Sequence, residues 1–321
     1  MATFLSGVSA YISLKNGQDL RAGRRFLLRR GIWLLTMTQK YSLTKIAILS
    51  LLAFSQFNLS AQLTPNQSGF AAVNDSMKVY YEVYGEGQPI VLLHGLYMTI
   101  NTNWSDFIPK LAKTRKVIAI EMQSHGHTPY SARKLSFAVL ADDVVKVLQH
   151  LKIDSADIFG YSVGGSIAYE LAIAHPKMVK KLFILSSTYR TEGWQIEIRN
   201  TVKELKPDFF YNTPFKKEYF RVAPDTSKWK SYLQQMIDFD NEEFNLGDEN
   251  VKKIKSAILI IVGDNDGIDK PVLISTYKLL GGAVSGDVAG IPKNHLAVLP
   301  GNSHVSLIMN PDKLFELINN F

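Results

Sequence analysis

The sequence predicts an α/β fold, with a mostly parallel central sheet, helices on both faces and an inserted helical cap. Three observations support this prediction. Short apolar runs of strand length recur along the chain, and stretches with helical spacing of apolar residues separate most of them. One apolar run enters a Gly-x-Ser-x-Gly pentad that opens directly into a helix-like stretch. Residues 188–256 interrupt this alternation for roughly 70 residues, which is far longer than an ordinary connection.

The individual elements follow from local patterns in residues 63–321. Two strands at 70–73 and 77–84 flank the turn pair Asn74-Asp75 and should form a hairpin. Apolar runs predict buried strands at 90–93, 117–120, 156–159, 182–185, 258–262 and 296–299. Helical spacing predicts helices at 104–112, 136–151, 167–173, 194–205, 227–239 and 270–280, with a closing helix through Leu314 and Ile318. Strands that alternate with helices pair in parallel through right-handed crossovers, so we expect one domain over 63–321 with a cap insertion at 188–256.

Residues 37–62 have the pattern of a secretory signal peptide. Met37 opens a short stretch with lysines and no acid, the apolar run 46–54 follows, and small and polar residues end it. The run is too short for a membrane span, which needs roughly 20 residues. We therefore expect a secreted or periplasmic protein with no stable membrane anchor once the signal is removed. The alternative is a buried or interfacial N-terminal helix.

Residues 1–36 precede this signal and are rich in arginine. We interpret them as an upstream extension or a start-site artefact, and the alternative is an unusually long basic leader. Residues 1–62 hold eight of the 36 basic residues and one of the 29 acidic residues, so 28 of each remain in 63–321. The predicted domain is formally neutral, and the charge gives no argument for nucleic-acid binding. The chain has no cysteine, which excludes disulfides, thiolate catalysis and cysteine–zinc sites.

The pentad Gly160–Gly164 predicts a nucleophile elbow at Ser162. This turn between a strand and a helix lifts one serine hydroxyl above the sheet, and flanking glycines keep the returning helix free of side-chain clashes. The following helix also presents free backbone N–H groups where an oxyanion can form. A plain glycine-rich turn between a strand and a helix is the competing interpretation.

A reactive serine needs a base, and the base needs a group that orients it. His304 follows the last predicted strand, and Asp266 follows the strand before it. The ends of parallel strands meet at one edge of a sheet, so both side chains should lie beside Ser162. Their order along the chain, serine then aspartate then histidine, is the order found with nucleophile elbows.

Over about residues 70–321 the chain resembles the α/β-hydrolase fold superfamily, in particular its esterases and lactonases with a helical cap. The matching motifs are Leu93-His94-Gly95, Ser124-His125-Gly126-His127-Thr128, Gly160-Tyr161-Ser162-Val163-Gly164-Gly165, Gly263-Asp264-Asn265-Asp266 and Gly301-Asn302-Ser303-His304. The resemblance implies Ser162 as nucleophile, His304 as general base and Asp266 as its orienting acid. It further implies an oxyanion hole formed by the backbone N–H groups of Leu96 and Val163. Glu121, Ser124 and Thr128 replace the family's usual residues in a segment that is structural.

Several residues keep alternative interpretations. Asp264 is a second candidate for the acid, and Glu192 is a weaker one. His94 either shapes its loop by bonding backbone or lines the substrate pocket, and Tyr161 either lines that pocket or packs. The aromatic residues of the cap form either an acyl pocket or the cap's own core; they are Trp194, Phe209, Phe210, Tyr211 and Phe215.

The expected function is a serine hydrolase that cleaves a small ester, lactone or thioester through an acyl-enzyme. We expect no metal and no organic cofactor, because His125 and His127 without further ligands make a poor metal site. The expected partner is a small-molecule substrate rather than nucleic acid, and the oligomeric state is left open. A carbon–carbon bond hydrolase shares the same triad. A hydrolase-like ligand-binding protein with little turnover is the alternative from another class.

Overall fold

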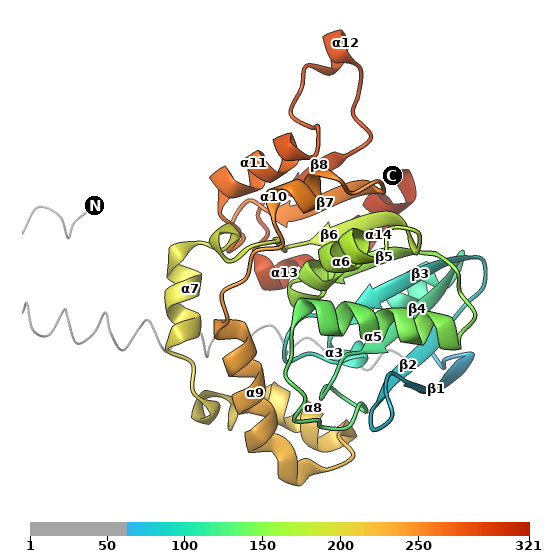
Figure 1. Ribbon diagram of the computed structural model, residues 1–321, viewed down its shortest axis with the longest axis vertical. Helices are drawn as coiled ribbons and strands as arrows, with labels where there is room; N and C mark the ends of the chain where they lie inside the picture. Colours follow the sequence, from blue (N-terminus) through green and yellow to red (C-terminus); the bar gives the residue numbers. More distant parts are fainter. Residues whose placement is uncertain (1–62) are drawn as a thin grey trace, which may run out of the picture. The chain divides into compact units, whose positions relative to one another are not determined.

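The computed structural model describes residues 63–321, so the predictions for 1–36 and for the signal peptide at 37–62 lie outside the described residues. Eight strands form one sheet in the order β1-β2-β4-β3-β5-β6-β7-β8 (Figure 1). The strands are β1 (Gln67–Ala72), β2 (Lys78–Tyr84), β3 (Gln88–Leu93), β4 (Arg115–Glu121), β5 (Ala156–Tyr161), β6 (Val179–Leu185), β7 (Ala257–Gly263) and β8 (His295–Leu299). β1 and β2 are antiparallel, β2 joins β4 antiparallel, and β3 to β8 run parallel. The predicted mostly parallel sheet is confirmed.

The helices connect these strands. They are α3 (Ile100–Trp104), α4 (Ile108–Leu111), α5 (Phe137–His150), α6 (Val163–Ala174), α7 (Ile196–Lys203), α8 (Pro214–Val222), α9 (Trp229–Asn241), α10 (Asp248–Lys252), α11 (Lys270–Leu279), α12 (Gly286–Ala289), α13 (His304–Ile308) and α14 (Pro311–Asn320). α5 begins at the predicted N-cap Ser136, whose side chain accepts the Val139 N–H. Among residues 63–321 no helix is both long enough and apolar enough to span a membrane.

The predicted helix at 104–112 is wrong, because the structure has two short helices there instead. α3 ends at Trp104, and α4 begins at Ile108 with Pro109 in its first turn. Proline has no backbone N–H, and its ring would clash with the carbonyl group four residues earlier in a continuous helix. Between α11 and β8 the chain contains the single-turn helix α12, which the spacing of apolar residues does not predict.

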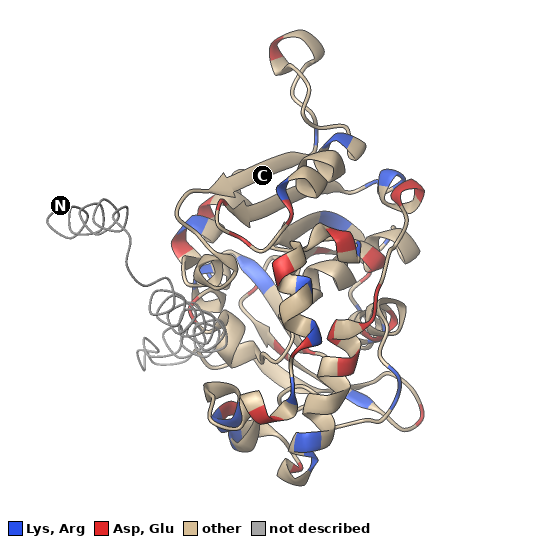
Figure 2. Cartoon of the chain, turned by 90° about the vertical axis from the view of Figure 1, so that its left-hand side faces the viewer, with Lys and Arg blue, Asp and Glu red and all other residues tan. Residues whose placement is uncertain are grey.

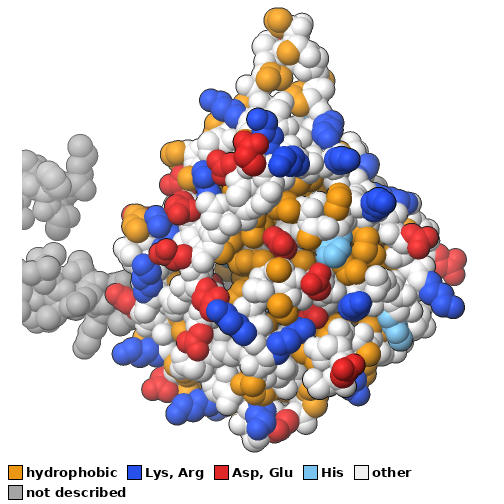
Figure 3. Space-filling view, in the orientation of Figure 1, with side chains coloured by type: hydrophobic (Ala, Val, Ile, Leu, Met, Phe, Trp, Pro, Cys, Tyr) orange, Lys and Arg blue, Asp and Glu red, His pale blue; other side chains and the backbone are white. Residues whose placement is uncertain are grey.

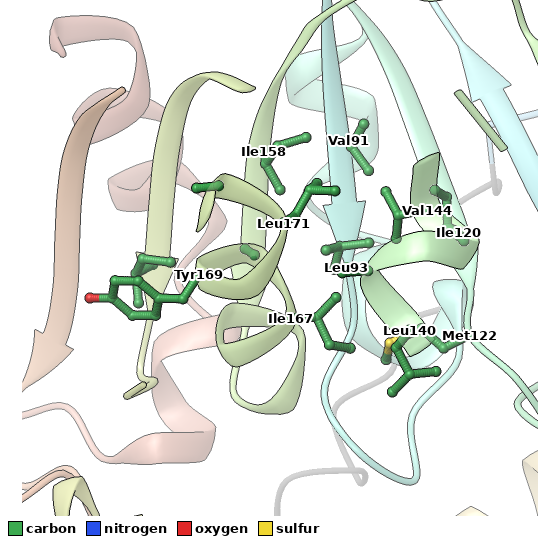
Figure 4. Close-up of a cluster of buried hydrophobic side chains, with 14 of the residues drawn as sticks. Val91, Leu93, Ile120, Met122, Leu140, Val144, Ile158, Ile167, Tyr169 and Leu171 are labelled. Carbon is green, nitrogen blue, oxygen red and sulfur yellow. The ribbon is translucent and has the colours of Figure 1, made fainter. Parts of the chain in front are cut away.

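Two apolar clusters cover the two faces of the sheet. Val91 and Leu93 point into one cluster, and Ile90 and Leu92 point into the other, because successive side chains of a strand alternate between faces. In the first cluster, side chains of α5 and α6 pack onto β3 and β5 (Figure 4). Helices α3, α4 and α14 supply the second cluster. The last four residues of β3 and all six residues of β5 are buried, so the loops at the carboxyl ends of these strands have a rigid base.

Residues 188–256 lie between β6 and β7 and form the helices α7 to α10, as Figure 1 shows. Pro207 and Pro214 begin helical turns within this cap. Basic and acidic side chains are interspersed on the face shown in Figure 2, in keeping with the equal numbers of each in 63–321.

Candidate active site

Ser162 lies at the turn between β5 and α6. Its backbone angles, φ 55° and ψ −123°, lie outside the ordinary regions for a residue with a side chain. The two flanking glycines make this turn possible. A Cβ at Gly160 would lie 2.2 Å from the Gly164 carbonyl oxygen, and a Cβ at Gly164 would lie 2.2 Å from the Leu93 carbonyl oxygen. The pentad therefore lets the strand, the turn and the helix approach one another without a side chain between them.

His304 reaches Ser162 from the loop after β8. Its Nε2 lies 3.2 Å from Ser162 Oγ. His304 is the first residue of α13, and a capping box between Ser303 and Ser306 fixes the start of that helix. The Tyr161 hydroxyl donates to the His304 carbonyl oxygen at 3.1 Å, so the elbow strand itself supports the backbone of the histidine.

Asp266, after β7, is the acid that the structure brings to His304. Its Oδ1 lies 3.3 Å from His304 Nδ1, and its side chain is fully buried. Burial alone would raise the pKa of Asp266, but hydrogen bonds from His304, Ser186 and the Gly263 N–H outweigh it and lower the pKa below its ordinary value. The carboxyl group is therefore ionised at neutral pH.

The two other candidate acids lie elsewhere. Asp264 is exposed and accepts the Asn302 N–H at 3.2 Å, so it fastens the loop after β7 to the loop after β8. Glu192 is exposed in a short turn of the cap. Neither carboxylate contacts the imidazole ring.

A residue that the sequence did not point to, Ser186, lies between His304 and Asp266. Its Oγ is 2.5 Å from Asp266 Oδ2 and 2.5 Å from His304 Nδ1. Ser186 directly follows β6, is fully buried and has a positive φ of 51°. A serine after an apolar strand has no motif of its own, and only the pairing of β6 with β7 puts it here.

The predicted oxyanion-hole amides belong to Leu96 and Val163. Val163 is the first residue of α6, where backbone N–H groups have no partner within the helix. Within residues 63–321 we find no protein acceptor for either amide. The loop that contains Leu96 is anchored from within, because Asn103 Oδ1 accepts the Gly95 N–H at 2.8 Å.

The structure corrects the pocket role predicted for His94 and supports the loop-shaping one. The ring is fully buried, its Nδ1 lies 2.8 Å from the Gly95 carbonyl oxygen, and its Nε2 accepts the Met122 N–H at 3.2 Å. Burial lowers the pKa of His94 well below its ordinary value, and the adjacent His125 adds to this effect, so the ring is neutral. Both nitrogens are engaged with backbone, and the ring has no surface left for a substrate.

The other two predicted pocket residues, Tyr161 and Trp194, both lie against the His304 ring. Tyr161 is 3% exposed, and its ring packs 5.0 Å from the His304 ring. The pocket role of Tyr161 is therefore corrected: it packs and supports His304. Trp194 is half-buried and presents an edge to the His304 ring at 5.4 Å.

A sequence model of the alpha/beta hydrolase fold family matches residues 88–258, more than half of the chain. The chain belongs to the α/β-hydrolase family. The chain is 40% identical over 106 residues to the 2-hydroxymuconate semialdehyde hydrolase of Pseudomonas sp. (strain CF600), a match that covers 32% of this chain and 38% of that protein. It is 26% identical over 279 residues to the pimeloyl-[acyl-carrier protein] methyl ester esterase of Nitrosospira multiformis, covering 76% and 98%. Among solved structures, Est816, described as an N-acyl homoserine lactone degrading enzyme, has a TM-score of 0.58 at 26% identity, covering 79% of this chain and 100% of Est816.

The cap of this α/β hydrolase packs onto the loop that holds Leu96. The Phe210 ring lies 4.7 Å from the Tyr97 ring, and the Phe215 ring lies 6.3 Å from it. Phe209, in contrast, is 47% exposed and points away from the core. Phe210 and Phe215 therefore pack against the loop that holds Leu96, whereas Phe209 does not. Hydrophobic side chains also gather in the middle of the face in Figure 3.

Polar contacts tie the cap of the hydrolase to its core. Ser124 Oγ donates to Gln235 of α9 at 3.0 Å, and Thr99 Oγ1 donates to Glu218 of α8 at 2.9 Å. Asp240 of α9 lies close enough to His304 to interact with it electrostatically, and burial raises the pKa of Asp240 to about 7. One more acid in an amphipathic helix gives no sequence signal, so this residue was not predicted.

The two histidines considered as a metal pair have other partners. His127 pairs with the buried Glu121, whose carboxylate also accepts the Ile100 N–H at 3.2 Å. His125 Nε2 accepts the Tyr97 N–H at 3.3 Å. Within residues 63–321 no group of three or more His, Cys, Asp or Glu side chains is arranged to hold a metal ion. Glu121 thus organises the segment in which the chain departs from its family's pattern.

Proposed function

We propose that this α/β hydrolase is a serine hydrolase that cleaves a small carboxylic ester, lactone or thioester. The observation behind the proposal is the 3.2 Å separation of His304 Nε2 from Ser162 Oγ at a strained strand-to-helix turn. In this proposal Ser162 is the nucleophile, His304 the general base and Asp266 the acid that orients it. Backbone N–H groups of Leu96 and Val163 form the oxyanion hole.

The reaction proceeds by acyl transfer in two steps. His304 Nε2 takes the Ser162 proton as Oγ attacks the carbonyl carbon, and the carbonyl oxygen becomes an oxyanion held by the two amides. One such donor contributes about 3–4 kcal/mol to the lowering of the barrier. The carbon–oxygen or carbon–sulfur bond breaks, and the leaving group takes the proton back from His304. Water then attacks the acyl-enzyme by the same route, which releases the acid and restores Ser162.

The substrate class rests on relatives that match most of their length. Both the methyl ester esterase and Est816 are covered almost entirely, and their names state an ester and a lactone. The similarity to the 2-hydroxymuconate semialdehyde hydrolase is higher but covers only 38% of that protein. Carbon–carbon bond cleavage is therefore the second candidate, and it uses the same serine, histidine and aspartate.

A fluorophosphonate probe tests the serine chemistry. We expect labelling of the folded wild-type protein and none of Ser162→Ala, with p-nitrophenyl esters or lactones hydrolysed only by the former. Labelling without turnover of any ester or lactone would favour the carbon–carbon hydrolase. No labelling of folded protein would contradict the proposal and favour the ligand-binding alternative.

We also infer a secreted or periplasmic location from residues 37–62, and neither interpretation of residues 1–36 alters it. The test is the mass of the protein recovered from outside the cytoplasm after expression of the full chain. We expect protein outside the cytoplasm whose mass lacks residues 37–62, and protein found only inside the cytoplasm contradicts the inference.

A further inference from the structure

The buried side chains around the imidazole of His304 include a hydroxyl group that the acyl-transfer scheme does not use. Ser186 Oγ lies at 2.5 Å from both His304 Nδ1 and Asp266 Oδ2, whereas the direct separation of Nδ1 from Asp266 Oδ1 is 3.3 Å. The shortest polar path from the ring to the carboxylate therefore runs through the serine.

The directions of these hydrogen bonds follow from the groups involved. Asp266 is ionised and accepts only, so the single proton of the Ser186 hydroxyl goes to the carboxylate. The lone pairs of Ser186 Oγ then accept the Nδ1–H of His304. This assignment leaves Nε2 unprotonated and able to take the proton of Ser162, which is the tautomer that a general base needs.

The backbone holds Ser186 in this place at a conformational cost. Its φ is 51°, in a region that residues with side chains rarely adopt, and its N–H is bound to the Ile261 carbonyl oxygen at 2.8 Å. The side chain is fully buried, so no water competes for either hydrogen bond. A strained, buried hydroxyl with two short hydrogen bonds is a group that is fixed before the substrate arrives.

We propose that Ser186 is a positioning residue that couples Asp266 to His304 and fixes the reactive tautomer of the ring. The proposal rests on the proposed serine hydrolase function. As Ser162 attacks, His304 becomes an imidazolium, and the hydrogen bond from its Nδ1–H to Ser186 Oγ becomes stronger. The hydroxyl proton remains on Ser186 and is still donated to the Asp266 carboxylate. Ser186 touches neither the substrate nor Ser162 and acts only through His304.

Ser186→Ala and Ser186→Gly form the test pair. Both remove the hydroxyl, but glycine adopts a positive φ without strain, so a loss shared by the two variants belongs to the hydroxyl and not to the backbone. We expect kcat for an ester substrate to fall about 10- to 100-fold in both variants with little change in KM. We also expect the acidic limb of the kcat/KM profile to move to lower pH by roughly half a unit or more, since the imidazolium loses its nearest acceptor.

Ser256→Ala is the matched control. Ser256 is also buried and donates to the backbone of β6, to the Val179 carbonyl oxygen at 2.8 Å, but at the opposite end of the strand. Its loss should lower the melting temperature without moving the pH profile. A ring nitrogen NMR titration of His304 in folded Ser186→Ala gives a readout that needs no substrate.

The outcomes separate this inference from the proposed function. If the fluorophosphonate does not label wild-type Ser162, the serine hydrolase function itself fails. If the wild type hydrolyses the ester and folded Ser186→Ala keeps both its kcat and the acidic limb of its pH profile, the positioning role of Ser186 is wrong and the proposed function stands. An acidic limb of the pH profile that moves to higher pH also contradicts the positioning role, because it would mean that the Ser186 hydroxyl weakens the pairing of His304 with Asp266.

Discussion

Strained backbone angles gather around one place in this hydrolase. Within residues 63–321, six residues other than glycine have a positive φ, and four of them lie in the turns that follow β3, β4, β5 and β6, at the edge of the sheet where the candidate site lies: Tyr97, Ser124, Ser162 and Ser186. Such angles persist only where the surrounding structure determines them, and they cluster at functional sites. Three of the four are serines, whose small side chains tolerate the crowded turns while they supply a hydroxyl group.

At the same scale, we expect Asp240 to make the stability of the fold depend on pH. Burial raises its pKa from 3.8 to about 7, and only the nearby His304 opposes the shift. Between these two pH values the folded protein holds a proton that the unfolded chain has lost, so the free energy of unfolding falls as pH rises through this range. Asp240→Asn removes the effect and should raise the free energy of unfolding above pH 7 by roughly 2–4 kcal/mol, with no gain below pH 4.

Urea unfolding at pH 4, 6 and 8 measures this difference. The control is Asp238→Asn, an exposed aspartate on the same helix, which should unfold like the wild type at every pH. An Asp240→Asn variant whose advantage does not grow between pH 4 and pH 8 would show that the carboxyl group titrates normally in the fold.

The residues that the sequence could identify are those with a motif or a place after a strand. Ser162 has the pentad, and His304 and Asp266 follow the last two strands, so topology alone brings them to one edge. Ser186 and Asp240 have no such signal. Their importance comes from burial and from neighbours distant in sequence, which only the packed structure shows. The same limit applies to His94, which lies within a family motif. The motif leaves open whether His94 lines the pocket or shapes its loop, and the two backbone contacts of the ring exclude the pocket.

At the scale of single elements, the close backbone packing of β3, β5 and α6 determines the position of the nucleophile. Gly164→Ala puts a Cβ 2.2 Å from the Leu93 carbonyl oxygen, and a backbone atom cannot turn away as a flexible side chain can. We expect a loss of about 2–4 kcal/mol in the free energy of unfolding and a large loss of hydrolase activity, because the elbow must shift.

Gly286→Ala is the matched control for that substitution. A Cβ there meets only the Ile291 side chain at 3.5 Å, which is ordinary contact, and the residue begins the helix α12. Its free energy of unfolding should stay within about 0.5 kcal/mol of the wild type. Equal melting temperatures for the two variants would mean that the elbow has more room than the structure shows.

The cap depends on a small number of polar links to the core. The Gln235 amide N–H donates to the Ser131 and Arg133 carbonyl oxygens, and its oxygen accepts the Ser124 hydroxyl. Gln235→Ala should lower the free energy of unfolding by about 1–2 kcal/mol, because the buried Ser124 hydroxyl loses its acceptor, whereas the two carbonyl oxygens keep Gln123 as a donor. It should also raise KM more than it lowers kcat, since Asp240 of the same helix lies close to His304. The neighbouring Gln234 binds only exposed Asp238, so Gln234→Ala should leave both constants unchanged in steady-state assays.

Sequence patterns predicted the elements of the sheet well because each buried strand is an uninterrupted apolar run. The hairpin, the parallel strands and the cap between β6 and β7 lie where the patterns put them, within a few residues. The failure at 104–112 has a local cause in Pro109, whereas the short helix α12 has no helical spacing of apolar residues because it packs against nothing.

At the scale of the whole described domain, α12 projects from the rest, and hydrophobic side chains lie at its tip (Figure 3). Val288 is 88% exposed and Ile291 is 82% exposed. A double variant, Val288→Ser with Ile291→Ser, should keep its melting temperature and ester turnover, because neither side chain has buried surface to lose. Leu280→Ser at the buried base of the same excursion should destabilise the fold clearly in thermal unfolding.

The position of this excursion follows from the chain's course. It precedes β8 and therefore lies at the amino edge of the parallel strands, whereas Ser162, Asp266 and His304 lie at the carboxyl edge. Since the sequence contains no cysteine, Val288→Cys would give the protein its sole thiol. A dye, a tether or a solid support attached there would be chemically uniform and would leave the substrate's route of entry open.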